Sequence, residues 1–140
     1  MIQINLLLLF VLGFMSTWFF EQHKLSLNIE GVASEDGNIC FAIYNDDVSF
    51  LKFDKVYKSG SEKAVKGKTA VNITDLPDGD YAIAIFHDAN GNKNLDTNML
   101  GIPKEQIAFY KGKMKMFGPP KFDECVFTLN SNMKMNISLQ

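Results

Sequence analysis

The chain has 140 residues, of which 46% are hydrophobic and 21% charged, and this is the composition of one ordinary globular domain. All 14 basic residues are lysine, and 16 acidic residues bring the formal net charge to −2. Because arginine is the usual residue for bidentate phosphate and guanine contacts, its absence argues against a nucleic-acid partner. Length and composition also argue against a multidomain enzyme, a coiled coil and a low-complexity linker.

We expect the first 22 residues to form a targeting segment rather than part of the fold. From Ile4 to Phe20 the chain is almost entirely apolar and uncharged, like the apolar region of a secretory signal. The run is also nearly as long as the ~20 residues that span a bilayer. No lysine precedes it and no A-x-A-like cleavage site follows, so a cleaved signal, an uncleaved anchor and a buried core helix remain open. The first two place residues 23–140 in the periplasm or outside the cell, with membrane contact only if the segment stays uncleaved.

The domain that follows begins with two runs typical of strands. Residues 25–30 alternate apolar and polar side chains at period two, and residues 39–44 are rich in β-forming side chains. A turn signal at residues 35–38 separates them, so together they predict a hairpin. In residues 48–58 apolar side chains recur at three and four positions, which indicates a short helical turn or a crossover. Residues 58–63 then read as a loop.

Five further runs complete the predicted fold. Residues 80–86 are the most apolar of these runs, and we expect them to form a central strand covered on both faces. A Pro-Asp-Gly turn precedes this strand, and an Asn-Ser-Asn turn joins the last two runs into a predicted pair. The other runs are residues 69–73, 106–110, 124–130 and 133–139. About seven strands without a long helix predict an all-β antiparallel sandwich, immunoglobulin-like or transthyretin-like.

Two cysteines, Cys40 and Cys125, lie in these strand-like runs. Their spacing is too wide for a CxxC redox or zinc motif. An exported protein with two cysteines permits one disulfide, and a strand also accommodates each cysteine as a small buried residue. The sequence leaves both alternatives open.

An oxygen-rich loop follows the central strand. Its acid and amide side chains fall at every second position: Asp88, Asn90, Asn92, Asn94, Asp96 and Asn98. The first three match positions one, three and five of an EF-hand-like calcium loop, Asn94 would give its backbone carbonyl at position seven, and Asp96 stands at position nine. The spacing therefore predicts a Ca²⁺ site with Asp88, Asn90, Asn92, Asn94 and Asp96 as ligands.

Two positions of the loop depart from that pattern. Lys93 stands where glycine makes the sharp turn, and Met99 stands where a bidentate glutamate closes the shell. Glu105 is the acid that we expect to complete the ligand set. The alternative is a ladder of Asx turns, in which asparagine and aspartate side chains bond their own backbone.

The two histidines and the lysine-rich segment carry further hypotheses. His87 precedes Asp88, and such a pair is either a catalytic base with its orienting acid or a structural hydrogen bond. His23, close to the targeting segment, is expected on the surface. Lys111, Lys113 and Lys115 alternate along the chain as a solvated edge or a strip for anionic surfaces. Phe117 follows in a rigid Phe-Gly-Pro-Pro connection, where it packs on the sandwich or contacts a partner.

Residues 79–105, GDYAIAIFHDANGNKNLDTNMLGIPKE, and 117–124, FGPPKFDE, resemble the bacterial family called domain of unknown function 2141. The resemblance covers about residues 25–140 and implies an exported small β-sandwich without an established activity. It implies a shared loop at the residues of the motif: His87, Asp88, Asn90, Asn92, Asp96, Gly101, Pro103 and Glu105. The chain departs from the family pattern at Lys93, where glycine is frequent, and at residues 107–110.

We therefore expect an exported, non-enzymatic β-sandwich whose loop orders around a cation, or around its own hydrogen bonds, and shapes one end for binding. The first alternative is a transthyretin-like hydrolase with His87 as base. The second is an envelope accessory subunit that docks on an envelope or surface partner through Phe117 and the exposed lysines.

Overall fold

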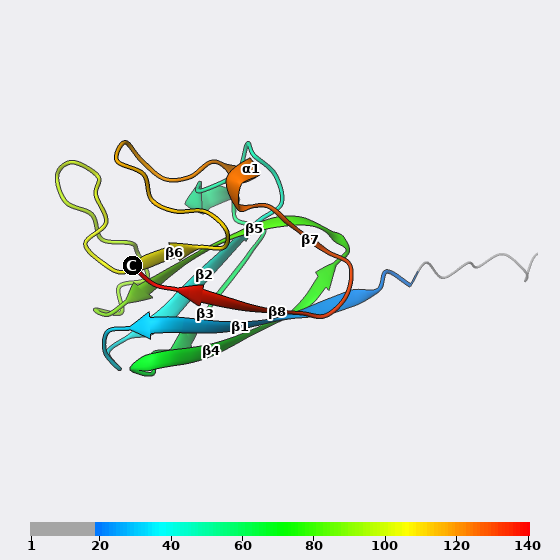
Figure 1. The fold of residues 1–140 in the computed structure, drawn as a ribbon, viewed down its shortest axis with the longest axis horizontal. Helices are drawn as coiled ribbons and strands as arrows, with labels where there is room; N and C mark the ends of the chain where they lie inside the picture. Colours follow the sequence, from blue (N-terminus) through cyan, green and yellow to red (C-terminus); the bar gives the residue numbers. More distant parts are fainter. Residues whose placement is uncertain (1–18) are drawn as a thin grey trace, which may run out of the picture.

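The computed structural model describes residues 19–140, so most of the expected targeting segment lies outside the described residues. Two β-sheets pack face to face (Figure 1). The small sheet has the order β4-β1-β8, with β1 at Gln22–Val32, β4 at Gly67–Pro77 and β8 at Met133–Ser138. The large sheet has the order β3-β2-β5-β6, with β3 at Lys58–Lys63, β2 at Asn38–Tyr44, β5 at Gly79–Asp88 and β6 at Ile107–Phe109; β7, Phe127–Leu129, also pairs with β5. The predicted all-β sandwich is confirmed, with eight strands rather than seven.

The core lies between the two sheets and follows from the period-two pattern. Leu25, Leu27 and Ile29 point inward from β1 and are almost completely buried. Ile83 and Ile85 of β5 lie on the inner face of the other sheet and are buried to the same degree. Each such side chain contributes about 1.5–3 kcal/mol by leaving water, so this alternation fixes which face of each strand points inward.

The predicted hairpin between the first two strands is wrong. β1 pairs with β4 and β8, whereas β2 pairs with β3 and β5. The chain therefore crosses from one sheet to the other between Val32 and Asn38. This link is longer than the two-residue turn that commits neighbouring strands to pair, so the pattern of each strand did not determine its partner.

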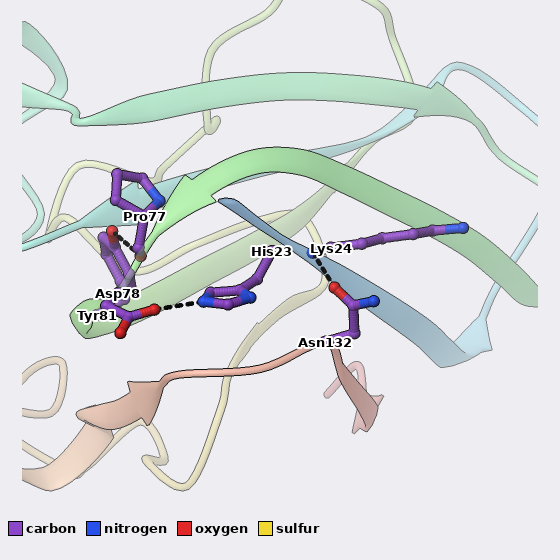
Figure 2. Close-up of polar contacts among 6 residues, drawn as sticks. All are labelled: His23, Lys24, Pro77, Asp78, Tyr81 and Asn132. Carbon is purple, nitrogen blue, oxygen red and sulfur yellow. Dashed lines mark hydrogen bonds and ion pairs between the residues drawn. The ribbon is translucent and has the colours of Figure 1, made fainter. Parts of the chain in front are cut away.

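The predicted pairing of the last two runs is also wrong. β7 pairs with β5, and β8 pairs in parallel with β1. Two asparagines of the last run hold it against β1: Asn132 accepts a hydrogen bond from the backbone N–H of Lys24 at 2.8 Å, and Asn136 accepts one from Asn28 at 3.0 Å. Figure 2 shows the first of these contacts. The sandwich is therefore antiparallel except for this pair.

Three segments differ in detail from expectation. Residues 58–63 form the edge strand β3 rather than a loop; their side chains are mostly exposed, so backbone pairing with β2 makes the strand without an apolar pattern. The expected helical turn is the 3₁₀ helix η1 at Phe53–Lys55. A one-turn helix, α1 at Phe122–Cys125, stands where the start of a strand was expected.

The sequence analysis expected His23 on the surface, but the residue is 96% buried. It pairs with Asp78 of the turn between β4 and β5, and this contact ties the start of β1 to that turn (Figure 2). Next to it, the Tyr81 hydroxyl donates to the Pro77 carbonyl oxygen at 2.8 Å.

Cys40 and Cys125 are both free thiols, so the disulfide alternative is not realised. Among residues 19–140, no helix has the length and apolar character needed to cross a membrane.

Candidate functional site

Asp88 is the anchor of the loop that follows β5, residues 88–105, which we call the Asp/Asn loop. It ends β5 and is fully buried. Its carboxylate accepts hydrogen bonds from the backbone N–H groups of Asn92, at 3.2 Å, and Lys93, at 2.9 Å. Lys93 adopts a φ of +64°, a left-handed conformation that costs a non-glycine residue about 1 kcal/mol. The buried acceptor offsets this cost, so the turn forms without the glycine that its position favours.

Asp96 binds the side-chain amides of two asparagines of the loop. Its carboxylate accepts hydrogen bonds from the side-chain N–H groups of Asn90 and of Asn92, the latter at 2.9 Å. The side-chain oxygens of the same asparagines accept backbone N–H groups at 3.2 Å and 2.9 Å. Asn94 contacts only Asn92, donating to its carbonyl oxygen at 3.1 Å. The Asx-turn ladder is therefore formed, and it brings Asp88, Asn90, Asn92 and Asp96 into one compact turn.

Glu105 closes the loop from its far end. Its side chain accepts the backbone N–H of Asp96 at 3.1 Å, and the backbone N–H of Lys104 donates to the Asp96 carbonyl oxygen at 2.8 Å. The side chain of Asn98 accepts the N–H groups of Leu100 and Ile102, at 2.9 Å and 3.0 Å, and so orders the tip. Glu105 thus meets the backbone of Asp96, but among residues 19–140 no three acids, histidines or cysteines are grouped closely enough to hold a metal ion.

The acids of the loop are held without ion pairs. Among residues 19–140, no lysine or histidine lies within ion-pair distance of Asp88, Asp96 or Glu105. Their charge reaches the neighbouring strand β2: burial, followed by the charges of Asp88 and Glu105, raises the pKa of the Cys40 thiol to about 11. Buried carboxylates are usually paired or hydrogen-bonded, and here backbone and amide N–H groups take that part.

His87 does not contact the side chain of Asp88. Its ring is buried, and Nε2 donates to the backbone carbonyl oxygen of Asp36 at 2.7 Å. Nδ1 lies 3.5 Å from Oε1 of Gln106, whose amide also bonds Gly31 and Ala33 at the end of β1. These contacts join β5 to the link between β1 and β2, which is a structural arrangement.

A second loop, residues 110–121, which we call the lysine loop, follows β6. Lys115 forms an ion pair with Glu124 of α1, and the backbone N–H of Lys121 donates to the same glutamate at 2.7 Å. The hydrogen bond from Lys115, and then the one from Lys121, holds the pKa of Glu124 below its usual value. Lys111 bonds the Val126 carbonyl oxygen. Lys113 is exposed and has no hydrogen-bond or ion-pair partner among the described residues.

An open groove of about 840 Å³ runs between the two loops. Leu100 and Ile102 line it from the Asp/Asn loop, and Met116 and Phe117 line it from the lysine loop. It adjoins a smaller apolar pocket of about 190 Å³ on the outer face of the large sheet, with Ala42 and Ala84 among its lining residues. Ala42 and Ala84 are opposite each other in the pairing of β2 with β5. Two methyl groups side by side leave room that longer side chains would fill.

The sequence analysis identified the acids and amides of the loop but not the groove. The wall of the apolar pocket that adjoins the groove includes Tyr44, Phe53, Phe86 and Phe109, which come from four separate segments of the chain. The only local signal was the recurrence of alanine at alternate positions of a strand, Ala82 and Ala84, where bulkier residues are usual.

Fold and site together define a small β-sandwich with a loop-walled groove at one end. A family model described as "Uncharacterized protein conserved in bacteria (DUF2141)" matches residues 27–138. The chain therefore belongs to the DUF2141 family, and the resemblance seen in the sequence is confirmed. Comparison with curated proteins and with solved structures gives no significant match.

Proposed function

We propose that this protein is an exported, non-enzymatic binding domain whose groove receives an apolar ligand or an apolar segment of an envelope or surface partner. The observation that carries the proposal is the pocket floor of Ala42 and Ala84 between aromatic walls. Binding sites are typically concave, mostly apolar and largely preformed. The apolar run from Ile4 to Phe20 supports export.

The Asp/Asn loop supports the proposal because it is ordered by hydrogen bonds where it lines the apolar pocket beside the groove. Leu95, Thr97 and Pro103 line the apolar pocket, and Thr97 and Pro103 form an isolated β-bridge with each other. Beside that bridge, the backbone of Asp96 accepts a hydrogen bond from Lys104 and donates one to the side chain of Glu105. A wall ordered in advance reduces the entropy that a ligand must overcome.

The contacts of His87 favour this role over hydrolysis. Its Nε2 proton is engaged by a backbone carbonyl, and its ring is buried. A general base needs a free nitrogen within reach of the proton that it removes. A structural histidine is the arrangement that these contacts support.

The proposal is tested with a substitution that fills the floor of the apolar pocket. We expect Ala84→Leu to weaken binding of the neutral apolar fluorophore N-phenyl-1-naphthylamine at least tenfold, because the added side chain occupies the space between the aromatic walls. Fluorescence titration measures the dissociation constant, and thermal unfolding verifies that the variant is folded. Equal affinity in the variant and the parent protein would contradict the proposal.

Ala70→Leu is the matched control. Ala70 is exposed on β4, in the other sheet, so the same addition there should leave fluorophore binding unchanged. If both variants lose binding equally, the fluorophore reports a loosened fold and not the groove.

We further propose that the Asp/Asn loop binds Ca²⁺, through Asp88, Asp96, Glu105 and the oxygens of Asn90, Asn92 and Asn94. Three carboxylates in one short loop without a cationic partner support this. Calcium prefers several oxygen ligands from a curled loop. The asparagine side-chain oxygens, which accept backbone N–H groups here, must turn toward the ion. Such rearrangement costs energy, so we expect weak, millimolar binding.

A further inference from the structure

We infer that the tips of the Asp/Asn loop and the lysine loop dock this domain onto an anionic lipid surface. Four large apolar side chains stand almost free of the protein at these tips: Met99 is 103% exposed, Leu100 83%, Met116 91% and Phe117 96%. Single exposed apolar residues are ordinary, but a group on two loops indicates an interaction site.

The two tips face one another. Leu100 from one loop and Met116 and Phe117 from the other line the same groove, although they are far apart in the chain. In Figure 1 the two loops project from the same end of the sandwich, beside each other. These three side chains therefore belong to one protruding surface, next to Met99 in the chain, which can enter a lipid interface as a unit.

Part of the backbone at these tips is paired within the protein. Asn98 accepts the N–H groups of Leu100 and Ile102, and Lys115 and Gly118 exchange backbone hydrogen bonds, the shorter at 2.8 Å. An unpaired backbone group entering the apolar part of a bilayer costs several kcal/mol. Pairing of these groups lowers the cost of placing the tips at the lipid interface.

Charge selects the kind of surface. Residues 88–121 hold six lysines and three acids, whereas the rest of the chain holds eight lysines and thirteen acids. Asp88, one of the three acids, is fully buried. Lys104 and Lys113 are exposed beside the tips. Lys115 is balanced by Glu124, just outside these residues, so the attraction to a negatively charged lipid surface comes from lysines without an ion pair among the described residues, Lys104 and Lys113 among them.

This inference does not depend on the occupant of the groove, because the tips carry it and the pocket floor does not. A tryptophan at the tip reports insertion directly. The full-length chain with Trp18→Phe receives Phe117→Trp in one variant and Asn72→Trp in the other; Asn72 is exposed on β4 of the opposite sheet. Both variants carry the same N-terminal segment, so its own membrane affinity contributes equally to each.

Each variant is mixed with vesicles of phosphatidylglycerol and phosphatidylcholine, or of phosphatidylcholine alone, with brominated acyl chains as quencher. We expect quenching and a blue shift for Phe117→Trp on the anionic vesicles, and neither for Asn72→Trp. Adding Lys113→Gln should weaken binding about fivefold, as expected for one lysine near an anionic membrane, whereas Lys134→Gln on β8 should not. Raising the salt concentration should weaken binding as well.

Three results would overturn the inference. They are no quenching from Phe117→Trp, equal quenching from both tryptophan positions, and equal quenching of Phe117→Trp on neutral and anionic vesicles. If Phe117→Trp is not quenched but the fluorophore still binds in the groove, the lipid-docking inference is rejected and the proposed groove function stands. The tips would then serve a protein partner instead. Loss of groove binding with intact quenching would reject the proposed groove function alone.

Discussion

At the scale of single residues, Gly37 determines where the Asp/Asn loop begins. It has a φ of +63°, and a Cβ there would lie 1.9 Å from the carbonyl oxygen of Asp88. Its own carbonyl oxygen accepts the backbone N–H of Ala64 at 3.2 Å. The link between the two sheets thus passes directly against the buried end of β5, and only a residue without a side chain permits this approach.

We predict that Gly37→Ala lowers the free energy of unfolding by about 2–5 kcal/mol, because a left-handed conformation and a backbone clash add together. Urea denaturation measures the change. Gly67→Ala is the control: Gly67 also has a positive φ, +88°, but nothing lies within 4 Å of the added Cβ. It should cost only about 1–2 kcal/mol. Equal costs at the two positions would show that the contact with Asp88 contributes nothing.

Residue chemistry also explains which site residues could be predicted. Asp88, Asn90 and Asn92 predict a turn because each side chain accepts a backbone N–H from within a few positions. Asp96 accepts the side-chain amides of Asn90 and Asn92, so local spacing suffices for it as well. Ala42 and Ala84 gave no such signal. Alanine is unremarkable in a strand, and these two matter only because β2 pairs with β5 in a register that places them opposite each other.

At the scale of elements, the Asp/Asn loop is held by contacts along its own chain and ends at a carboxylate, Glu105. Its acids repel one another in the absence of a cation. An ion that binds the folded loop and not the unfolded chain stabilises the protein by mass action.

We predict that Ca²⁺ raises the unfolding temperature, with ~2.7 kcal/mol of added stability at a hundred times its dissociation constant. Asp96→Asn should abolish the shift, since it removes a charge while its side-chain oxygen still accepts hydrogen bonds. Asp54→Asn, an exposed acid of η1, should leave the shift intact. No shift at millimolar Ca²⁺, or the same shift with Mg²⁺, would remove calcium from the proposed function.

Elements with an apolar pattern were predicted, and the element without one was not. β1, β4 and β8 alternate buried and exposed side chains, β5 is a nearly continuous apolar run, and the sequence identified all four. β3 was missed because its side chains are mostly exposed and its pairing with β2 uses only the backbone. Both predicted hairpins failed for one reason: a strand pattern specifies a buried face, not a partner.

At the scale of the whole molecule, the small sheet is completed by strands from distant parts of the sequence. Leu25 pairs with Met133 and Ile29 with Ile137, in parallel. β4 lies on the other side of β1, so β1 is central and neither neighbour follows it directly in the chain. We therefore expect the sandwich to unfold as one cooperative unit.

We predict that Ile137→Ala, in the core at 4% exposure, lowers the stability of the whole sandwich by about 2–5 kcal/mol. Circular dichroism and tyrosine fluorescence should shift together, as a two-state transition requires. The adjacent exposed Ser138, changed to alanine, should have an effect within about 0.5 kcal/mol. Separate transitions for the two probes would show that the sheets unfold independently.

The direction of β1 has a consequence for how the protein is held in space. The strand starts at Gln22 beside Pro77, and its other end meets Gln106 at the base of the Asp/Asn loop. Eleven extended residues span about 36 Å. Anything attached ahead of Gln22, whether an anchor or an engineered tag, therefore leaves from the pole remote from the groove, and the sandwich acts as a rigid spacer that presents its loops to a surface on the far side.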